Sequence, residues 1–292
     1  MMPLRPDLSA LSSRLTETPV TRFAPSPTGY LHLGHVVNAL YVWGIAGALG
    51  GRVLLRIEDH DRRRTKIRFE ESILDDLDWL GFVPDAGRSP VVRQSDRPAR
   101  YEDALERLRR SHHVYGCDCS RRVIGSERYG NTCRNRDLET GPGVGARVEM
   151  GPGSERFWDG TDEREEAPAA FGDLLIRDRE GHWTYQFSVV VDDEQDGVNL
   201  VIRGADLTGS TARQIRLGRM LGRSTPAQFF HHPLLLDPSG RKLSKSDGDV
   251  GVREMRAAGA SAPEVLGRAA VAAGLRDFPH PLRAIDVVLL FG

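Results

Sequence analysis

The stretch that decides the fold is Val20–Ile57, which reads VTRFAPSPTGYLHLGHVVNALYVWGIAGALGGRVLLRI. Its first four residues are typical of a short strand, and the turn residues Pro25–Gly29 must end it. Apolar residues then recur at a helical spacing over 37–48, until the pair Gly50–Gly51 breaks the pattern. Arg52–Ile57 is β-branched and apolar enough for a buried strand. This order predicts two parallel strands joined by a crossover helix.

The same alternation of strands and helices continues along the chain. The periodicity predicts a helix over Lys66–Leu80 with Gly81 as its C-terminal cap, and another helix that opens at Asp96. We therefore expect an α/β fold, a doubly wound, Rossmann-like parallel sheet, in a catalytic domain over residues 20–250. The further elements expected in it are strands over Leu174–Arg177, Trp183–Val191, Val198–Arg203 and Phe229–Leu236, and a helix over Thr211–Leu221.

Two segments depart from this pattern. Residues 112–170 are rich in Gly, Arg and turn residues and predict a subdomain inserted into the catalytic domain. Residues 251–292 are rich in alanine and predict a short helical C-terminal segment.

The composition excludes several classes of protein. With 39% hydrophobic and 28% charged residues, the chain is neither disordered nor a disulfide scaffold. A net charge of −1 excludes a uniformly basic surface. The most apolar stretch, 36–49, is shorter than the roughly 20 residues that span a bilayer, and residues 1–20 contain no apolar run typical of a signal peptide. We expect a soluble, cytoplasmic protein that makes no contact with membranes and acts as a monomer.

A turn with two histidines follows the first strand. His32 and His35 flank Gly34 where the crossover helix begins. A glycine lets a ligand approach the backbone, and the helix N-terminus attracts anions. The pattern is that of a phosphate site, although two turn histidines without a ligand would read the same way.

A second signal lies in the lysines. Of 40 basic residues only three are lysine, and Lys242 and Lys245 stand together in RKLSKS. A lysine is a compact point charge that an arginine does not replace at a tight anionic site. The pair follows a Pro-Ser-Gly turn, so we expect it on a loop that contacts the triphosphate of a nucleotide and the departing pyrophosphate.

The two motifs together resemble the HIGH and KMSKS motifs of class I aminoacyl-tRNA synthetases. The segments RFAPSPTG at 22–29, RIED at 56–59, VVVDD at 189–193 and IRGADL at 202–207 are similar to the glutamate-activating branch of that family. The resemblance runs from about Thr21 to Asp247. Within the branch the chain is most similar to the short glutamyl-queuosine tRNA(Asp) synthetases, which lack an anticodon-binding domain.

A pocket for glutamate needs cations for two carboxylates and an anion for the ammonium group. Arg22 and Arg203 suit the carboxylates because a guanidinium binds a carboxylate in a bidentate manner. Glu58 suits the ammonium group, and Tyr185 can add a neutral hydrogen bond. The resemblance implies that these four line the amino-acid site together with the rest of the segment 22–26, which is Phe23, Ala24, Pro25 and Ser26.

The three cysteines, Cys117, Cys119 and Cys133, could form at most one disulfide and would leave an odd thiol. With one more ligand they would instead form a tetrahedral zinc site. Spacing leaves His112, His113 or Tyr129 as the fourth ligand, and zinc chemistry alone favours a histidine. The resemblance implies Tyr129 instead, because the short branch holds one structural zinc per chain with a Cys-x-Cys and a Tyr-x-x-x-Cys set.

The resemblance implies that the chain activates L-glutamate with ATP and Mg²⁺ and transfers it to the queuosine base in the anticodon of tRNA(Asp). His32, Gly34, His35, Lys242 and Lys245 would be the catalytic residues, with His32, His35 and Lys245 on ATP. Only 46 residues follow Ser246, which favours this acceptor over tRNA(Glu). Three alternatives remain open here, namely a truncated glutamyl-tRNA synthetase that charges the 3′ end of tRNA(Glu), a related nucleotidylyltransferase and a non-catalytic tRNA-binding paralogue.

We predict that Lys245→Ala slows adenylate formation by about 10²–10³, the usual loss for one donor that acts on transition-state charge. Glutamate binding should change little, because the ammonium group acts on charge that develops later. Glutamate-dependent exchange of pyrophosphate into ATP measures both quantities. Lys245→Arg should also be impaired, and an arginine variant as fast as the parent would contradict this interpretation of the lysines.

Overall fold

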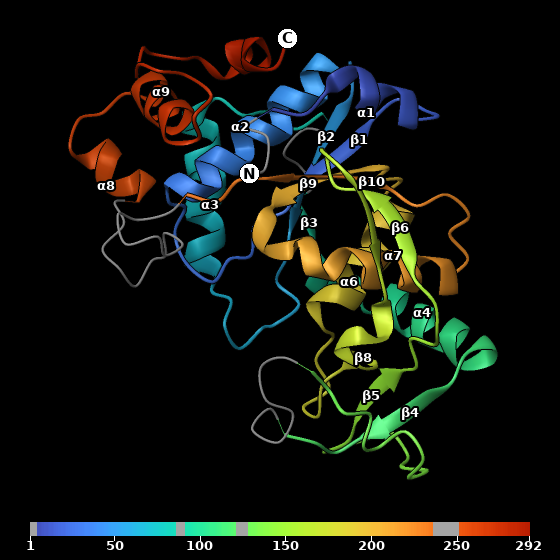
Figure 1. The fold of residues 1–292 in the computed structure, drawn as a ribbon. Coiled ribbons are helices and arrows are strands. Elements are labelled where there is room, and N and C mark those ends of the chain that lie inside the picture. Colours follow the sequence, from blue (N-terminus) through green and yellow to red (C-terminus); the bar gives the residue numbers. More distant parts are fainter. Residues whose placement is uncertain (1–4, 86–90, 121–127, 236–250) are drawn as a thin grey trace.

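The computed structural model describes residues 5–85, 91–120, 128–235 and 251–292 (Figure 1). Three strands, β1 (Val20–Phe23), β2 (Arg52–Ile57) and β3 (Val92–Arg93), pair in parallel in the order β1-β2-β3. The predicted crossover between the first two is helix α2 (Leu33–Ala48). Helices α3 (Ile67–Leu80) and α4 (Pro98–Ser111) flank β3 in the chain. The α/β architecture expected from the first 60 residues is confirmed.

A second parallel pair, β9 (Leu200–Gly204) and β10 (Gln228–His232), is joined by α7 (Thr211–Met220). It lies beside β1, because the backbone N of Asn199 donates to the carbonyl of Val20 over 3.0 Å. The Asn199 Oδ1 atom accepts from the Val20 backbone N over 2.8 Å. The carboxyl ends of β1, β2, β9 and β10 therefore face one edge, where an open α/β sheet binds its ligands.

The strand predicted over Trp183–Val191 is wrong, because the structure has helix α6 (Tyr185–Gln195) there. Its residues 187–193 are all buried. A helix buried on every side shows no amphipathic period, so its aromatic and β-branched residues look like a buried strand. Strand β10 also ends before the predicted Leu236, since Pro233 cannot donate to a ladder.

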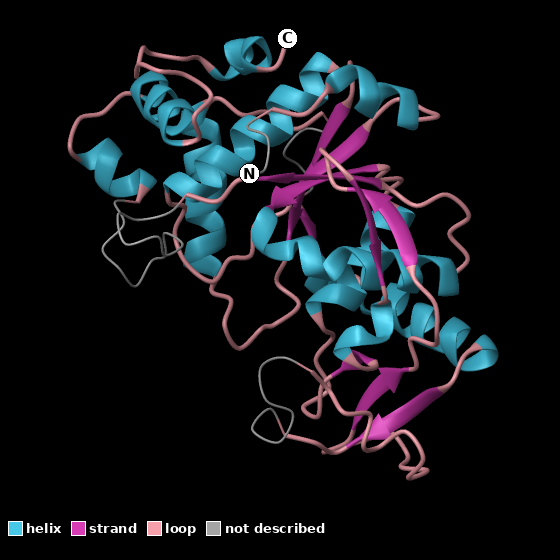
Figure 2. Cartoon of the chain, viewed as in Figure 1, coloured by secondary structure: helices cyan, strands magenta, loops and turns pink. Residues whose placement is uncertain are grey.

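The expected insert contains an antiparallel sheet, drawn in the lower part of Figure 2. Strand β5 (Gly145–Val148) is its central strand and pairs with β4 (Val114–Cys117) on one side and with β8 (Leu174–Arg177) on the other. Strand β8 lies just beyond the predicted boundary at residue 170. The hairpin of β6 (Glu155–Trp158) and β7 (Glu163–Glu166) instead packs on the catalytic core. Its Phe157 ring lies 6.4 Å from that of Phe229 on β10.

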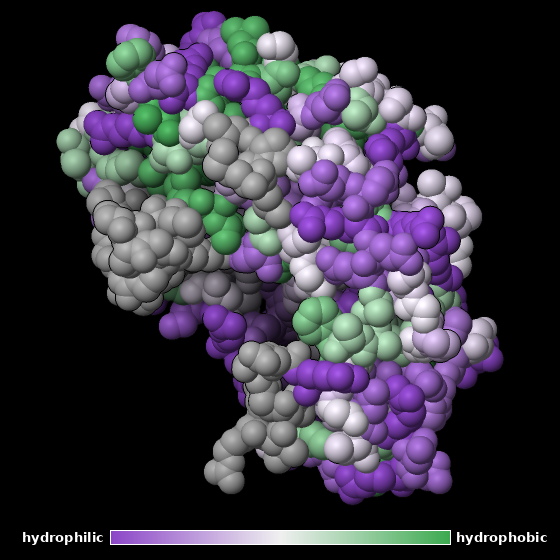
Figure 3. All heavy atoms as spheres, in the orientation of Figure 1, coloured by the Kyte–Doolittle hydropathy of each residue, from purple (hydrophilic) through white to green (hydrophobic). Residues whose placement is uncertain are grey.

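The helices predicted after residue 250 are α8 (Val252–Ala257) and α9 (Ala262–Ala272), followed by a 3₁₀ turn over Ala284–Leu290. They lie beside α2 and α3 (Figure 1). Figure 3 shows hydrophobic side chains at the surface of this part, whereas the part with β4 and β5 is mostly hydrophilic. The remaining elements are α1 (Leu8–Arg14), which sequence analysis missed, and 3₁₀ turns over Gln94–Asp96, Pro168–Phe171 and Ala205–Ser210. Among the helices described, none is long and apolar enough to cross a membrane.

Candidate functional site

A cavity of about 530 Å³ opens at the carboxyl ends of the parallel strands. Every described residue that the sequence predicts for glutamate or ATP lines it. These are Arg22, Phe23, Ala24, Pro25, Ser26, His32, Gly34, His35, Glu58, Tyr185 and Arg203. The structure thus brings the segment 22–35 together with Glu58, Tyr185 and Arg203, which are far from it and from one another in the chain. Lys242 and Lys245 lie outside the described residues.

The two histidines form the N-terminal cap of α2. The backbone N of Gly34 donates to His32 Nδ1 over 3.1 Å, and the backbone N of His32 donates to His35 Nδ1 over 3.2 Å. Since Nδ1 accepts in both rings, a neutral ring carries its proton on Nε2. The ring centroids are 3.9 Å apart, so the two Nε2–H groups belong to one patch of donors.

The packing of His32 gives a second reason for a glycine at position 34, besides the approach of a ligand. A Cβ atom there would lie 2.9 Å from Cε1 of His32, closer than side-chain atoms ordinarily approach. A side chain at this position would displace the ring that caps the helix.

Arg56 on β2 is a functional residue that sequence analysis missed. Its side chain is only 2% exposed. Its Nη1 lies 2.8 Å from Asp193 Oδ1 and its Nη2 lies 3.1 Å from Glu58 Oε1. Burial lowers the pKa of Arg56, but Asp193, Glu58 and Asp192 together raise it well above the ordinary value. The signal was available, because Arg56 is a charged residue in the interior of an otherwise apolar strand.

Arg22 is held by the same carboxylate. Its Nε donates to Asp193 Oδ1 and Oδ2 over 3.1 and 3.2 Å. Burial raises the pKa of Asp193, yet Arg22 and Arg56 bring it below the ordinary value, so the carboxylate is charged. The Nη2 group of Arg22 has no hydrogen-bond partner among the described residues, and Arg22 lines the cavity.

Arg203 differs from Arg22 in having only neutral partners. It donates to Gln214 Oε1 over 2.6 Å and to Thr211 Oγ1 over 2.8 Å, and its Nε lies 3.3 Å from His231 Nε2. Burial and the nearby Arg203 lower the pKa of His231 to about 3, so this ring is neutral and accepts. Within the described ranges no carboxylate forms an ion pair with Arg203. A buried guanidinium whose described partners are all neutral suits an anion that enters the cavity.

Glu58 and Tyr185, which also line the cavity, suit an ammonium group. Glu58 uses Oε1 on Arg56 and is itself buried. Burial, and then the charge of Glu58, raise the pKa of Tyr185, so its phenol is neutral. Two guanidinium groups and one carboxylate around one cavity are the complement of an amino acid with two carboxylates.

Sequence analysis also missed the wall formed by Asn38 and His232. Asn38 is the one polar residue between Val36 and Leu40 in α2, and its Nδ2 lies 3.0 Å from His232 Nε2. The His232 ring stacks on Tyr41 with centroids 4.8 Å apart. A lone amide in an apolar helix was the signal that could have found this pair.

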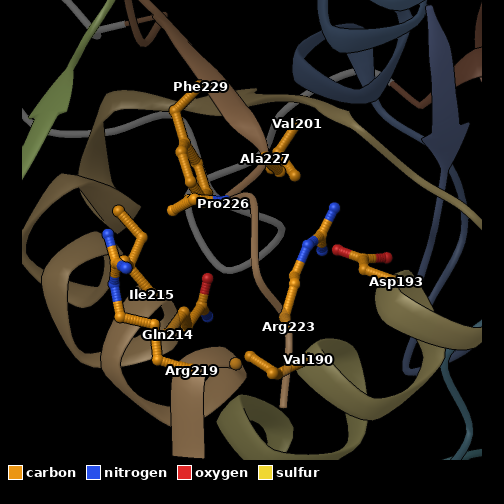
Figure 4. A pocket seen from close by; sticks show the side chains of 11 residues that line it. Val190, Asp193, Val201, Gln214, Ile215, Arg219, Arg223, Pro226, Ala227 and Phe229 are labelled. Carbon is orange, nitrogen blue, oxygen red and sulfur yellow. The ribbon is translucent and has the colours of Figure 1, made fainter. Parts of the chain in front are cut away.

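A second, much smaller cavity of about 30 Å³ lies between α6, α7 and the β9–β10 pair (Figure 4). It has room for one or two water molecules and is too small for a substrate. Asp193 and Gln214, the partners of Arg22 and Arg203, line it from behind. In Figure 4 the Arg223 side chain points toward Asp193. This cavity therefore adjoins the side chains that hold Arg22 and Arg203, but it is not part of the larger cavity that these arginines line.

The three cysteines meet in the insert. Their Sγ atoms all lie within 4.8 Å of one another. The Tyr129 hydroxyl lies 3.6 Å from Cys117 Sγ, whereas His113 lies 3.2 Å from Glu149. Three thiols and a phenol are a tetrahedral donor set that suits zinc.

Two arginines contact the cysteine cluster, and its members differ in acidity. Arg147 Nε lies 3.2 Å from Cys117 Sγ, and Arg136 Nη1 lies 3.3 Å from Cys133 Sγ. Burial raises the pKa of Cys133, but hydrogen bonds from Tyr129 and other neighbours bring it down to about 7. Burial and the neighbouring Cys117 raise the pKa of Tyr129, so this phenol ligates only where a cation removes its proton.

The chain is similar to known proteins over most of its length. A family model described as tRNA synthetases class I (E and Q), catalytic domain, matches residues 19–142 and 144–274. A glutamyl-Q tRNA(Asp) synthetase of Rhodobacter capsulatus is 40% identical over 277 residues, covering 84% of this chain and 98% of that protein. Another, of Symbiobacterium thermophilum, is 40% identical, covering 92% and 91%. The crystal structure of the glutamate-tRNA synthetase from Elizabethkingia anophelis has a TM-score of 0.79 at 26% identity, covering 94% of this chain and 66% of that chain.

We predict that Arg56→Met lowers the free energy of unfolding by about 3–5 kcal/mol, because it leaves Asp193 and Glu58 as buried, uncompensated charges. Urea denaturation measures the loss. The matched control is Arg100→Met, which removes a more exposed partner of Asp196 at 3.1 Å and should cost about 1 kcal/mol or less. Equal losses in the two variants would contradict the special role of Arg56.

Proposed function

The chain belongs to the class I tRNA synthetases specific for glutamate and glutamine, and we propose that its site activates L-glutamate with ATP and transfers it to a tRNA. The observation that carries this proposal is Arg203, a buried cation without a carboxylate partner in the described structure, which shares one cavity with Arg22 and Glu58. The carboxylates of glutamate supply the missing anions, and Glu58 receives its ammonium group.

The activation is an in-line displacement. An oxygen of the glutamate α-carboxylate attacks the α-phosphorus of ATP, the bond to pyrophosphate breaks, and glutamyl-adenylate forms. The protein positions the reactants and stabilises charge without a covalent intermediate. The Nε2–H groups of His32 and His35 suit the phosphate oxygens, Lys245 suits the departing pyrophosphate, and Mg²⁺ accompanies ATP.

The pocket discriminates by charge. Glutamine has the length of glutamate but would leave one guanidinium without an anion. The penalty for a buried charge that loses its partner is several kcal/mol, enough to reject glutamine. Aspartate has both carboxylates but is one methylene shorter, so it cannot reach both guanidinium groups with the same geometry.

For the acceptor, we propose the queuosine base in the anticodon of tRNA(Asp). The two curated relatives at 40% identity, both named glutamyl-Q tRNA(Asp) synthetases, support this choice. An unpaired anticodon loop, whose bases can be splayed out, suits entry into an open cavity. The rival acceptor, the 3′ end of tRNA(Glu), has support from the likeness to a glutamate-tRNA synthetase structure at 26% identity.

For the cysteine cluster, we propose one structural zinc ion held by Cys117, Cys119, Cys133 and Tyr129. The clustered Sγ atoms and the distance from Tyr129 support this ligand set. The ring of Tyr129 also lies under the Arg147 guanidinium, with Cζ 3.6 Å from the ring centroid, and this cation favours a phenolate.

We predict that labelled glutamate is transferred to queuosine-modified tRNA(Asp) and survives removal of the 3′-terminal adenosine. Unmodified tRNA(Asp) transcript should remain unlabelled, because it lacks the queuosine base. Pyrophosphate exchange without RNA serves as the control for activation, with glutamate active and glutamine and aspartate inactive. Efficient charging of tRNA(Glu) at its 3′ end would establish the rival acceptor instead, and the absence of exchange would contradict activation itself.

We predict about one equivalent of zinc per chain by elemental analysis, and a lower content in Cys133→Ser, which removes a thiolate ligand. Tyr129→Phe should also lower the zinc content, whereas His113→Ala should leave it unchanged. The reverse pattern in the last two variants would make His113 the fourth ligand. A parent protein that is free of metal and fully stable would contradict the zinc site.

A further inference from the structure

A second open cavity adjoins the catalytic one. Its volume is about 780 Å³, and it lies between Tyr129, the start of α6 and the start of α7. Tyr185 and Asp206 line both cavities, so the two are neighbours that share this wall. Neither the glutamate site nor the ATP site described above uses the rest of its lining.

The floor of this cavity carries an exposed aromatic ring. Phe171, at the end of the Pro168–Phe171 turn, is 43% exposed. Its position is fixed, because its carbonyl accepts from the Tyr129 backbone N over 3.2 Å. A large ring that is anchored through its backbone and open to solvent on one side can stack against a flat ligand.

Beside the ring stands an uncompensated cation. Arg213 on α7 donates Nη2–H to the carbonyl of Gly172 over 3.1 Å, and its Cζ lies 5.9 Å from the Phe171 ring centroid. Its Nε is buried without a hydrogen-bond partner. Burial, and then the nearby Arg147, lower the pKa of Arg213 to about 10, so it is still charged at neutral pH.

The other charged groups of the cavity make it cationic. Arg128 and Arg147 line it together with Arg213. The carboxylate of Asp173 is already neutralised by Arg134, whose Nε and Nη2 lie 2.8 and 2.9 Å from its two oxygens.

Arg147 already donates to Cys117 Sγ and to the carbonyl of Asp173, so Arg213 and Arg128 are the cations that remain for a ligand. Asp206 lies at the wall shared with the catalytic cavity. An aromatic platform next to such guanidinium groups is the arrangement that binds single-stranded nucleic acid, with the base on the ring and the phosphate on the cations.

We propose that Phe171 and Arg213 bind the nucleotide next to the one that receives glutamate. The base of that nucleotide stacks on the Phe171 ring, and its phosphate contacts Arg213 and Arg128. The reacting nucleotide then enters the adjoining cavity past Tyr185. This proposal rests on the proposed transfer of glutamate to RNA, and it assigns the substrate contacts to residues outside the amino-acid and ATP sites.

Steady-state transfer to whichever tRNA the parent protein charges tests the platform. Phe171→Ala should raise the KM for tRNA about tenfold, the usual order for the loss of one stacked base. Phe171→Trp should restore it, since the larger ring still stacks. The control is Phe278→Ala, which truncates a ring that is 67% exposed in the C-terminal segment. Pyrophosphate exchange without RNA should be unchanged in all three variants.

Salt dependence tests the cations. Arg213→Gln and Arg128→Gln should each lower the slope of log KM for tRNA against log salt by about one phosphate contact. Arg128 is exposed, so its variant reports even if Arg213→Gln folds poorly. The control is Arg156→Gln on the β6–β7 hairpin, which should leave the slope unchanged.

The outcomes separate this inference from the proposed function. A parent without exchange or transfer overturns the proposed function. A parent that transfers glutamate, with variants of Phe171 and Arg213 that match their controls, overturns only the platform. Loss of exchange in Phe171→Ala would also overturn it, because the effect would then be structural.

Discussion

The guanidinium of Arg56 lies inside the α/β core and contacts Asp193 and Glu58 at the same time. Its contact with Asp193 also holds Arg22 in place, and its contact with Glu58 holds the carboxylate that is proposed to bind the ammonium group of glutamate. A cation and an anion that line the cavity are therefore positioned by the same buried guanidinium. A buried ion pair adds little net stability compared with apolar residues, but it specifies one arrangement of its members. In this chain that arrangement fixes Arg22 and Glu58, two of the residues proposed to bind glutamate.

The two arginines that line the cavity differ in whether a carboxylate of the protein compensates their charge. Arg22 is compensated by Asp193, whereas Arg203 is solvated only by neutral oxygens and a neutral imidazole. Desolvation lowers the pKa of Arg203 and makes the free pocket unfavourable for a cation. A carboxylate that arrives there gains a strong interaction because no protein group competes for it. In the proposed glutamate complex, selectivity and affinity would thus come from the same charge.

The sequence predicted that Arg22, near the end of β1, and Glu58, directly after β2, line one cavity. This was possible because parallel strands bring their carboxyl ends to one edge of a sheet. The sequence did not predict helix α6, since its residues 187–193 are buried on all sides and show no helical period. The pairing of β8 with β5, beyond residue 170, and the approach of Arg213 to Phe171 depend on tertiary packing. The spacing of the cysteines predicted that they cluster. Spacing alone could not show that Tyr129 lies near Cys117 whereas His113 lies near Glu149, because these contacts depend on the tertiary fold.

Leu235 lines the catalytic cavity, and Gly251 forms an antiparallel bridge with His32. The backbone N of Val252 also donates to the carbonyl of Leu31 over 3.0 Å. The C-terminal segment therefore begins against the turn that caps α2, so the packing of this segment on α2 and α3 also holds that turn in place.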